Sequence, residues 1–147
     1  MKELILSIFT VLVFIGCGSV EQKAQYNYIS AEDTASLIRK SPEKIVLVDI
    51  QEKEDFEEEH LKGAKATYAY PVKTDEERAS LTKLVMDIKP EQKVIVICPR
   101  GGGGADRAYD HLLSKGIKKD QLFTLTDGQY AWPRESIKDV LLGSEVE

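Results

Sequence analysis

The sequence has few of the residues that build crosslinked or metal-bound folds. Its 147 residues include two cysteines and two histidines. The cysteines, Cys17 and Cys98, are too few for a disulfide scaffold and form no Cys-x-x-Cys redox pair. Together with His60 and His111 they show no metal-ligand spacing. We therefore expect neither a metal centre nor a cofactor.

An excess of positive charge is also missing. The formal net charge is −5 and is spread along the chain. This argues against nucleic acid as a partner, because phosphate binding needs a basic patch. The one strongly biased run is acidic, at residues 52–60, and is typical of a solvated helix face. With 42% hydrophobic and 31% charged residues, the chain has the composition of a globular domain, which we expect to be monomeric.

The apolar run near the N-terminus is too short to span a bilayer. Residues 4–16 are 13 positions without charge, whereas a membrane-spanning helix needs about 20. This is the length of a signal-peptide core. Gly16 and Cys17 at its end resemble the bacterial lipoprotein signal, in which the cysteine is acylated and becomes the new N-terminus. An uncleaved hydrophobic anchor is the alternative.

Three segments follow from this interpretation. We predict a lipoprotein signal peptide over residues 1–16, a lipid-anchored polar tether over residues 17–27 and a folded domain over residues 28–147. The domain would then lie at the bacterial cell envelope, anchored to the membrane by lipid on Cys17 and facing the periplasm or the outer surface. If Cys17 carries lipid, Cys98 is the free thiol of the mature chain.

Strands and helices alternate along the predicted domain. Continuous apolar runs at residues 44–50 and 93–98 are typical of buried parallel strands. Further strands are predicted at residues 66–69 and 121–126. Helices are predicted after a Ser30 cap, over the acidic run, at residues 75–88 and 105–115, and after Pro133. This order predicts an α/β fold of three layers, a central parallel sheet of about five strands with helices on both faces.

The stretch from Cys98 to Gly104 has the clearest chemical pattern. It follows the strongest predicted strand and precedes a predicted helix, and ligands of parallel sheets bind beyond the carboxyl ends of the strands. A thiol at a helix N-terminus has its thiolate form favoured, and glycines bring backbone N–H groups close to an anion. We predict Cys98 as the nucleophile; the cradle for its anionic ligand would consist of Arg100, Gly101, Gly102, Gly103 and Gly104.

Other interpretations of the glycine run fit less well. No lysine follows the glycines, as a phosphate-binding loop requires. Asp106 stands where the dinucleotide-binding pattern has its third glycine. A tight turn beside a buried, inert cysteine needs one or two glycines rather than four.

Three segments in order resemble the rhodanese-like sulfurtransferase family. They are VDIQEKEDFEEEHLKGA at residues 48–64, the Cys98 loop, and LTDGQYAW at residues 125–132. The resemblance implies that the cysteine thiolate takes the outer sulfur of a small anion such as thiosulfate. The persulfide then passes that sulfur to a thiol or to cyanide. Asp49 and His60 fall in register with the family, and we expect supporting roles for both.

The sequence departs from the family pattern at several places, among them Glu59 and Asp127, which each replace a glycine. Gln51 stands where arginine is usual and Asp55 where glutamate is usual, so their ion pair is reduced to a hydrogen bond at most. The loop also counts one residue longer than the common sulfurtransferase loop. Arsenate reductases and some phosphatases share the longer loop but place an arginine six residues after the cysteine, where this chain has Gly104. Sulfur transfer is our first hypothesis; a non-enzymatic rhodanese-like binding module and an oxyanion enzyme are the alternatives.

Overall fold

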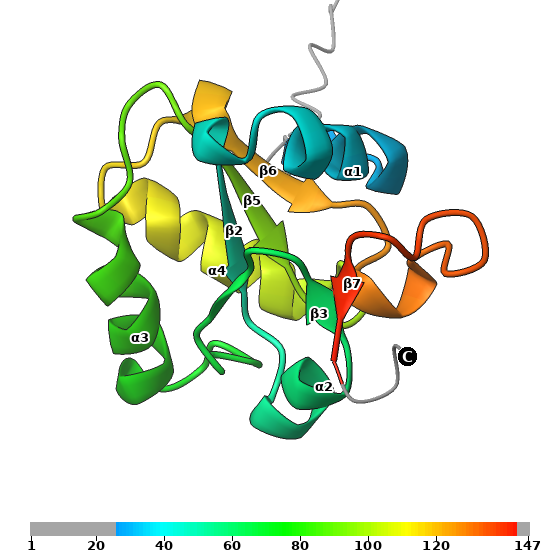
Figure 1. Cartoon of the computed structure of the whole chain (residues 1–147). Coiled ribbons are helices and arrows are strands. Elements are labelled where there is room, and N and C mark those ends of the chain that lie inside the picture. Colours follow the sequence, from blue (N-terminus) through cyan, green and yellow to red (C-terminus); the bar gives the residue numbers. More distant parts are fainter. Residues whose placement is uncertain (1–25, 144–147) are drawn as a thin grey trace, which may run out of the picture.

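Five parallel strands form the centre of the structure, a computed structural model that describes residues 26–143 (Figure 1). Their order across the sheet is β1 (Tyr28–Ile29), β6 (Leu122–Leu125), β5 (Lys93–Ile97), β2 (Ile45–Asp49) and β4 (Lys65–Ala66). Each pairing within this sheet is parallel. The predicted fold class is therefore confirmed.

The predicted signal peptide, Cys17 and most of the predicted tether lie outside the described residues. Within residues 26–143, no helix is both long enough and apolar enough to cross a membrane.

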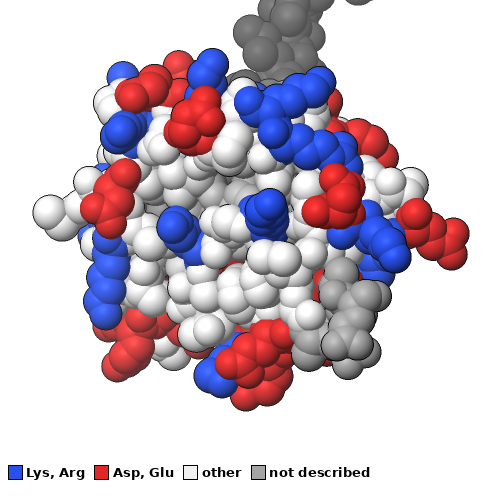
Figure 2. Space-filling view, viewed as in Figure 1, with Lys and Arg blue, Asp and Glu red and all other residues white. Residues whose placement is uncertain are grey.

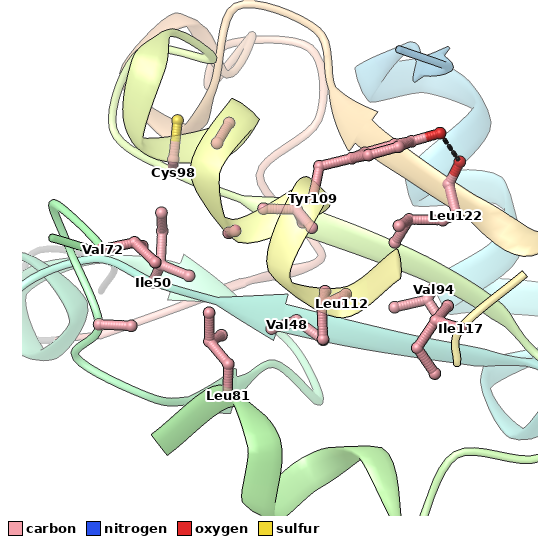
Figure 3. Close-up of a cluster of buried hydrophobic side chains, with 14 residues drawn as sticks. Val48, Ile50, Val72, Leu81, Val94, Cys98, Tyr109, Leu112, Ile117 and Leu122 are labelled. Atoms are coloured by element: carbon pink, nitrogen blue, oxygen red, sulfur yellow. Dashed lines mark hydrogen bonds between the residues drawn. The ribbon is translucent and has the colours of Figure 1, made fainter. Parts of the chain in front are cut away.

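Two apolar clusters cover the two faces of the sheet, because side chains alternate between faces along each strand. On one face, Val48, Val94 and Val96 pack with residues of α4 (Gly103–Ser114) and with Leu81 of α3 (Asp75–Val85). Figure 3 shows this cluster. On the other face, Leu47 and Ile95 pack with residues of α1 (Ala31–Lys40). The three predicted layers follow from this arrangement.

Local signals set the starts of the helices. The Ser30 side chain accepts the N–H of Asp33 and caps α1 as predicted. Thr74 and Glu77 form a capping box at the start of α3. The acidic run forms α2 (Lys53–Glu58), in which no residue is buried. Figure 2 shows acidic side chains gathered at the lower edge of the molecule, where Figure 1 places α2.

The helix predicted after Pro133 is wrong. Turns occupy residues 134–136, and the chain then forms β7 (Leu141–Leu142), which pairs antiparallel with β3 (His60–Leu61). The apolar residues Ile137, Val140 and Leu141 have helical spacing, yet they are buried in the second cluster by turns and by this pairing. Trp132 fixes the first turn, because its Nε1–H donates to the carbonyl of Ile137 at 2.6 Å.

The register brings the ends of the central strands to one level. Asp49 of β2 lies opposite Ile97 of β5, and the N–H of Ile50 donates to the carbonyl of Ile97. The segments that follow β2 and β5 therefore begin side by side, and Cys98 is the first residue after β5.

Candidate active site

Cys98 lies between the end of β5 and the start of α4. The side chain belongs to the apolar cluster that contains Ile50 and Ala105, and the residue is 1% exposed. Its sulfur points away from Ile50 and Val72 (Figure 3). The backbone N–H of Gly101 donates to this Sγ at 2.7 Å. A glycine amide of the loop is therefore in contact with the thiol.

The glycine run is partly helix rather than loop. α4 begins at Gly103, two residues before the predicted start, and Gly102 is its N-cap without a side-chain cap. Asp106 is the donor to the Gly102 carbonyl at 3.1 Å, so the N–H groups of Gly103, Gly104 and Ala105 precede the first helical hydrogen bond. The loop that remains is short, and the helix N-terminus directly faces it.

Gly104 is covered by an aromatic ring. A Cβ on this residue would lie 2.7 Å from Cε2 of Tyr70, and a second neighbour, Cδ1 of Ile50, is 3.7 Å away. Gly104 is buried, and Tyr70 is half-buried. A side chain at the position six residues after the cysteine would therefore clash with the Tyr70 ring unless that ring moved.

The turn at residues 127–130 holds the cysteine loop through backbone contacts. Gln129 and Tyr130 donate their N–H groups to the carbonyls of Cys98 and Pro99 at 2.8 and 3.0 Å. Gly128 has φ of 73° and comes so close that a Cβ would lie 2.5 Å from the Cys98 carbonyl oxygen. The Asp-Gly pair after a strand is the sequence signal that could have identified this support.

The two arginines near the loop point to different places. The Arg100 guanidinium carbon lies 5.6 Å from the ring centroid of Tyr130, over the face of that ring. The Arg107 side chain runs back along α4, and its Nε–H donates to the Pro71 carbonyl at 2.9 Å. Arg100, which the sequence predicts in the cradle, is thus directed towards the 127–130 turn.

Asp49 is buried on the opposite face of the sheet from Cys98. Its neighbours Val48 and Ile50 belong to the cluster of Cys98, so the Asp49 side chain faces the other way. Its carboxylate accepts the backbone N–H of Gln51 at 2.9 Å and the Gln51 Nε2–H at 3.1 Å. Burial raises the pKa of the Asp49 carboxyl to about 7, and these two hydrogen bonds lower it only in part.

A family comparison agrees with the strand, loop and helix around Cys98. The model of the rhodanese-like domain family matches residues 30–135. The chain belongs to the rhodanese-like domain family. Four of the five strands of its central sheet, the cysteine loop and the supporting turn lie within the matched residues, and β1 lies just before them.

Several solved structures are similar to this rhodanese-like domain. The As-Sb reductase from Leishmania major matches with a TM-score of 0.64 and 17% identity, over 84% of this chain and 91% of that chain. The BH2092 protein from Bacillus halodurans matches with a TM-score of 0.62 and 21% identity, over 81% of this chain and 78% of that chain. A thiosulfate sulfurtransferase from Pseudomonas aeruginosa matches with a TM-score of 0.62 and 15% identity, over 82% of this chain and 20% of that chain. At these identities the likeness shows the fold alone.

His60 has a structural place in this rhodanese-like domain. Its Nδ1 lies 2.7 Å from the Phe56 carbonyl oxygen. Its ring stacks on that of Phe56 with centroids 3.9 Å apart. These contacts join the end of α2 to β3.

Gln51 and Asp55 stand where the family usually has an ion pair, and a different pair of residues forms an ion pair in this part of the domain. Gln51 donates to Asp49 rather than to Asp55. Asp55 instead accepts the hydroxyl of Tyr130 at 2.7 Å, and this hydrogen bond together with burial raises the pKa of Tyr130 to about 12. Glu59 forms a two-point ion pair with Arg134, at 2.7 Å to Nε and 2.6 Å to Nη2. Sequence reasoning did not find this pair, because its members are far apart in the chain.

Among residues 26–143, no group of three or more His, Cys, Asp or Glu side chains is arranged to hold a metal ion. The arrangement at the start of α4 is a thiol in contact with a backbone amide, at the N-terminus of a helix.

Proposed function

We propose that this rhodanese-like domain is a sulfurtransferase that carries sulfur on Cys98. The observation that supports the proposal most directly is the 2.7 Å contact between the Gly101 N–H and the Cys98 Sγ, at the N-terminal end of α4. The amide donor and the positive end of the helix dipole both stabilise negative charge on sulfur. The same groups serve the thiolate before transfer and the persulfide anion after it.

The reaction has two displacements. The Cys98 thiolate attacks the outer sulfur of a donor such as thiosulfate, a new S–S bond forms, and sulfite leaves with the electron pair of the bond that breaks. A nucleophilic acceptor, cyanide or a thiolate, then attacks the terminal sulfur of the persulfide. The Cys98 thiolate leaves with its electron pair and is regenerated. The Cys98 residue is 1% exposed, so the thiol is shielded from bulk water.

The Tyr70 ring argues against the oxyanion alternative. A phosphate or arsenate group is held best by a two-pronged arginine. The position that would carry this arginine is Gly104, and the ring of Tyr70 occupies the space beside it. The similar fold of the As-Sb reductase therefore does not extend, in our proposal, to its chemistry.

Persulfide formation tests the proposal. The full chain is incubated with thiosulfate, and the peptide that contains Cys98 is examined by mass spectrometry. We expect this peptide to gain the mass of one sulfur atom and to lose it again when cyanide is added, with release of thiocyanate. Cys98→Ser is the matched control, and we expect no gain.

The alternatives predict different results. A non-enzymatic binding module would form no persulfide with thiosulfate or with other sulfane donors, although the chain remains folded by circular dichroism. An oxyanion enzyme would hydrolyse a phosphate ester in a Cys98-dependent way. Either result would contradict sulfur transfer.

We also propose, from the sequence, that lipid on Cys17 anchors a monomeric domain to the cell envelope. Residues 1–25 lie outside the described part of the chain, so this proposal depends on the signal pattern alone. Cys17→Ser is expected to move the protein from the membrane fraction to the soluble fraction. Retention in the membrane would favour an uncleaved anchor.

A further inference from the structure

We infer that Arg107, rather than Arg100, supplies the fixed positive charge that binds the anionic sulfur donor at Cys98. The inference depends on the proposed function for the identity of the donor. Its geometric basis is the position of the Arg107 guanidinium at the first turn of α4.

The guanidinium of Arg107 lies against the backbone of Gly103. Its Nη1 is 3.1 Å, and its Cζ and Nη2 are 3.8 Å, from the position that a Cβ on Gly103 would take. Arg107 is four residues further along α4, and helical side chains lean towards the N-terminus, which brings the guanidinium back to the first turn. Because Gly103 has no side chain, the guanidinium fits beside the first N–H groups of the helix.

This placement is unfavourable for the helix alone. The N-terminus of a helix carries partial positive charge, so a cation there is destabilising unless an anion compensates it. Among the ion pairs formed by residues 26–143, none contains Arg107. Asp106 places one negative charge in this first turn. An anion bound next to Cys98 would add a second counter-charge for the helix N-terminus and Arg107 together.

A hydrogen bond keeps the guanidinium in place. Its Nε–H donates to the Pro71 carbonyl at 2.9 Å. The preceding residue, Tyr70, packs its ring against Gly104. The segment at residues 70–71 thus contacts α4 at two points and leaves the Nη groups of Arg107 as donors for a ligand.

Arg100 has a different environment. Its guanidinium lies over the Tyr130 ring, and the Tyr130 hydroxyl donates to the carboxylate of Asp55. The positive charge of Arg100 is therefore directed to an aromatic face with an acidic neighbour. It is less available to an anion at the helix N-terminus.

The arrangement favours donors with more negative charge. The guanidinium fork and the N–H groups of Gly103, Gly104 and Ala105 all favour an anion. Thiosulfate carries two negative charges and the methanethiosulfonate ion carries one, and both present a terminal sulfur. We expect Arg107 to increase the preference for thiosulfate over methanethiosulfonate.

The test compares four full-length variants by the second-order rate of persulfide formation on the Cys98 peptide. For Arg107→Gln we expect about a tenfold to hundredfold loss with thiosulfate, the size of one charged hydrogen bond, and a smaller loss with methanethiosulfonate. Arg107→Lys should recover part of the rate, because it keeps the charge but not the fork. Arg100→Gln tests the competing assignment and should lose less than Arg107→Gln. Arg78→Gln, on the surface of α3, controls for loss of one positive charge.

Alkylation separates this inference from the proposed function. Iodoacetate is an anion and iodoacetamide is neutral, and both react with Cys98 whether or not the protein transfers sulfur. We expect the rate with iodoacetate divided by the rate with iodoacetamide to fall in Arg107→Gln. Local loosening of the loop would raise both rates and leave this ratio unchanged. If no variant forms a persulfide but this ratio falls, sulfur transfer fails and the role of Arg107 stands. If the ratio and the thiosulfate rate fall only in Arg100→Gln, or in neither variant, Arg107 is not the anion-binding cation.

Discussion

The contact between Gly128 and the cysteine loop allows a quantitative prediction for Gly128→Ala. The added Cβ would lie 2.5 Å from the Cys98 carbonyl oxygen and 2.6 Å from both the Arg100 nitrogen and the Pro99 carbonyl oxygen. These are backbone atoms, so rotation of a side chain cannot relieve the contact. The two loops must separate by about 1 Å to reach an ordinary distance of about 3.5 Å.

That separation breaks the two hydrogen bonds between the loops. At 2.8 and 3.0 Å, the bonds from Gln129 to Cys98 and from Tyr130 to Pro99 would lengthen beyond the usual range. Their loss costs about 1 kcal/mol each. The positive φ of Gly128 adds about 1–2 kcal/mol for a residue with a side chain. We expect a total loss of about 3–4 kcal/mol in the free energy of unfolding.

Gly63→Ala is the matched control. Gly63 has φ of 84°, yet a Cβ there would meet no atom within 4 Å. This substitution should cost only the backbone term of about 1–2 kcal/mol. Urea unfolding of both variants measures the difference, and persulfide formation by folded Gly128→Ala should fall by about a hundredfold, as expected for a displacement near 1 Å. If Gly128→Ala costs no more than Gly63→Ala, the close approach of the two loops does not stabilise the site.

Two further predictions concern the buried groups around the loop. The pKa of Asp49 is raised in the folded state from 3.8 to about 7, so its contribution to stability is full below pH 4 and is lost as the pH rises through 7. Urea unfolding from pH 4 to pH 7 should show a steeper loss in the wild type than in Asp49→Asn, and equal slopes would refute the assignment. Gly104→Ala should lose about 1–3 kcal/mol through its contact with Tyr70. The same substitution in a Tyr70→Ala background should lose much less, and a double-mutant cycle without coupling would contradict the contact.

Local sequence patterns were sufficient to predict the central strands, the start of α1 and the position of Cys98. The β-branched apolar runs of β2 and β5 favour buried strands, and the Ser30 cap carries its signal within four residues. The position of Cys98 between a strand and a helix N-terminus follows from the same patterns. For these features the local preference and the global fold agree.

Long-range packing decided what the sequence could not predict. Glycine has low helix propensity, so Gly103 and Gly104 were expected to be loop, yet they form the first turn of α4 where Tyr70 packs against it. Ile137, Val140 and Leu141 have helical spacing but are buried through turns and, at Leu141, through pairing with β3. The side-chain directions of Arg100 and Arg107 depend on Tyr130 and Pro71, which lie outside the glycine motif.

The bonds between the cysteine loop and the 127–130 turn have a consequence for how such a domain can change during evolution. They join main-chain atoms of Cys98, Pro99, Gln129 and Tyr130, so they do not depend on which side chains stand at the last three positions. Of these side chains, that of Tyr130 is 47% exposed, so it can be exchanged while the loop keeps its shape. Gly128 has no such freedom, because its missing side chain is what lets the two backbones meet.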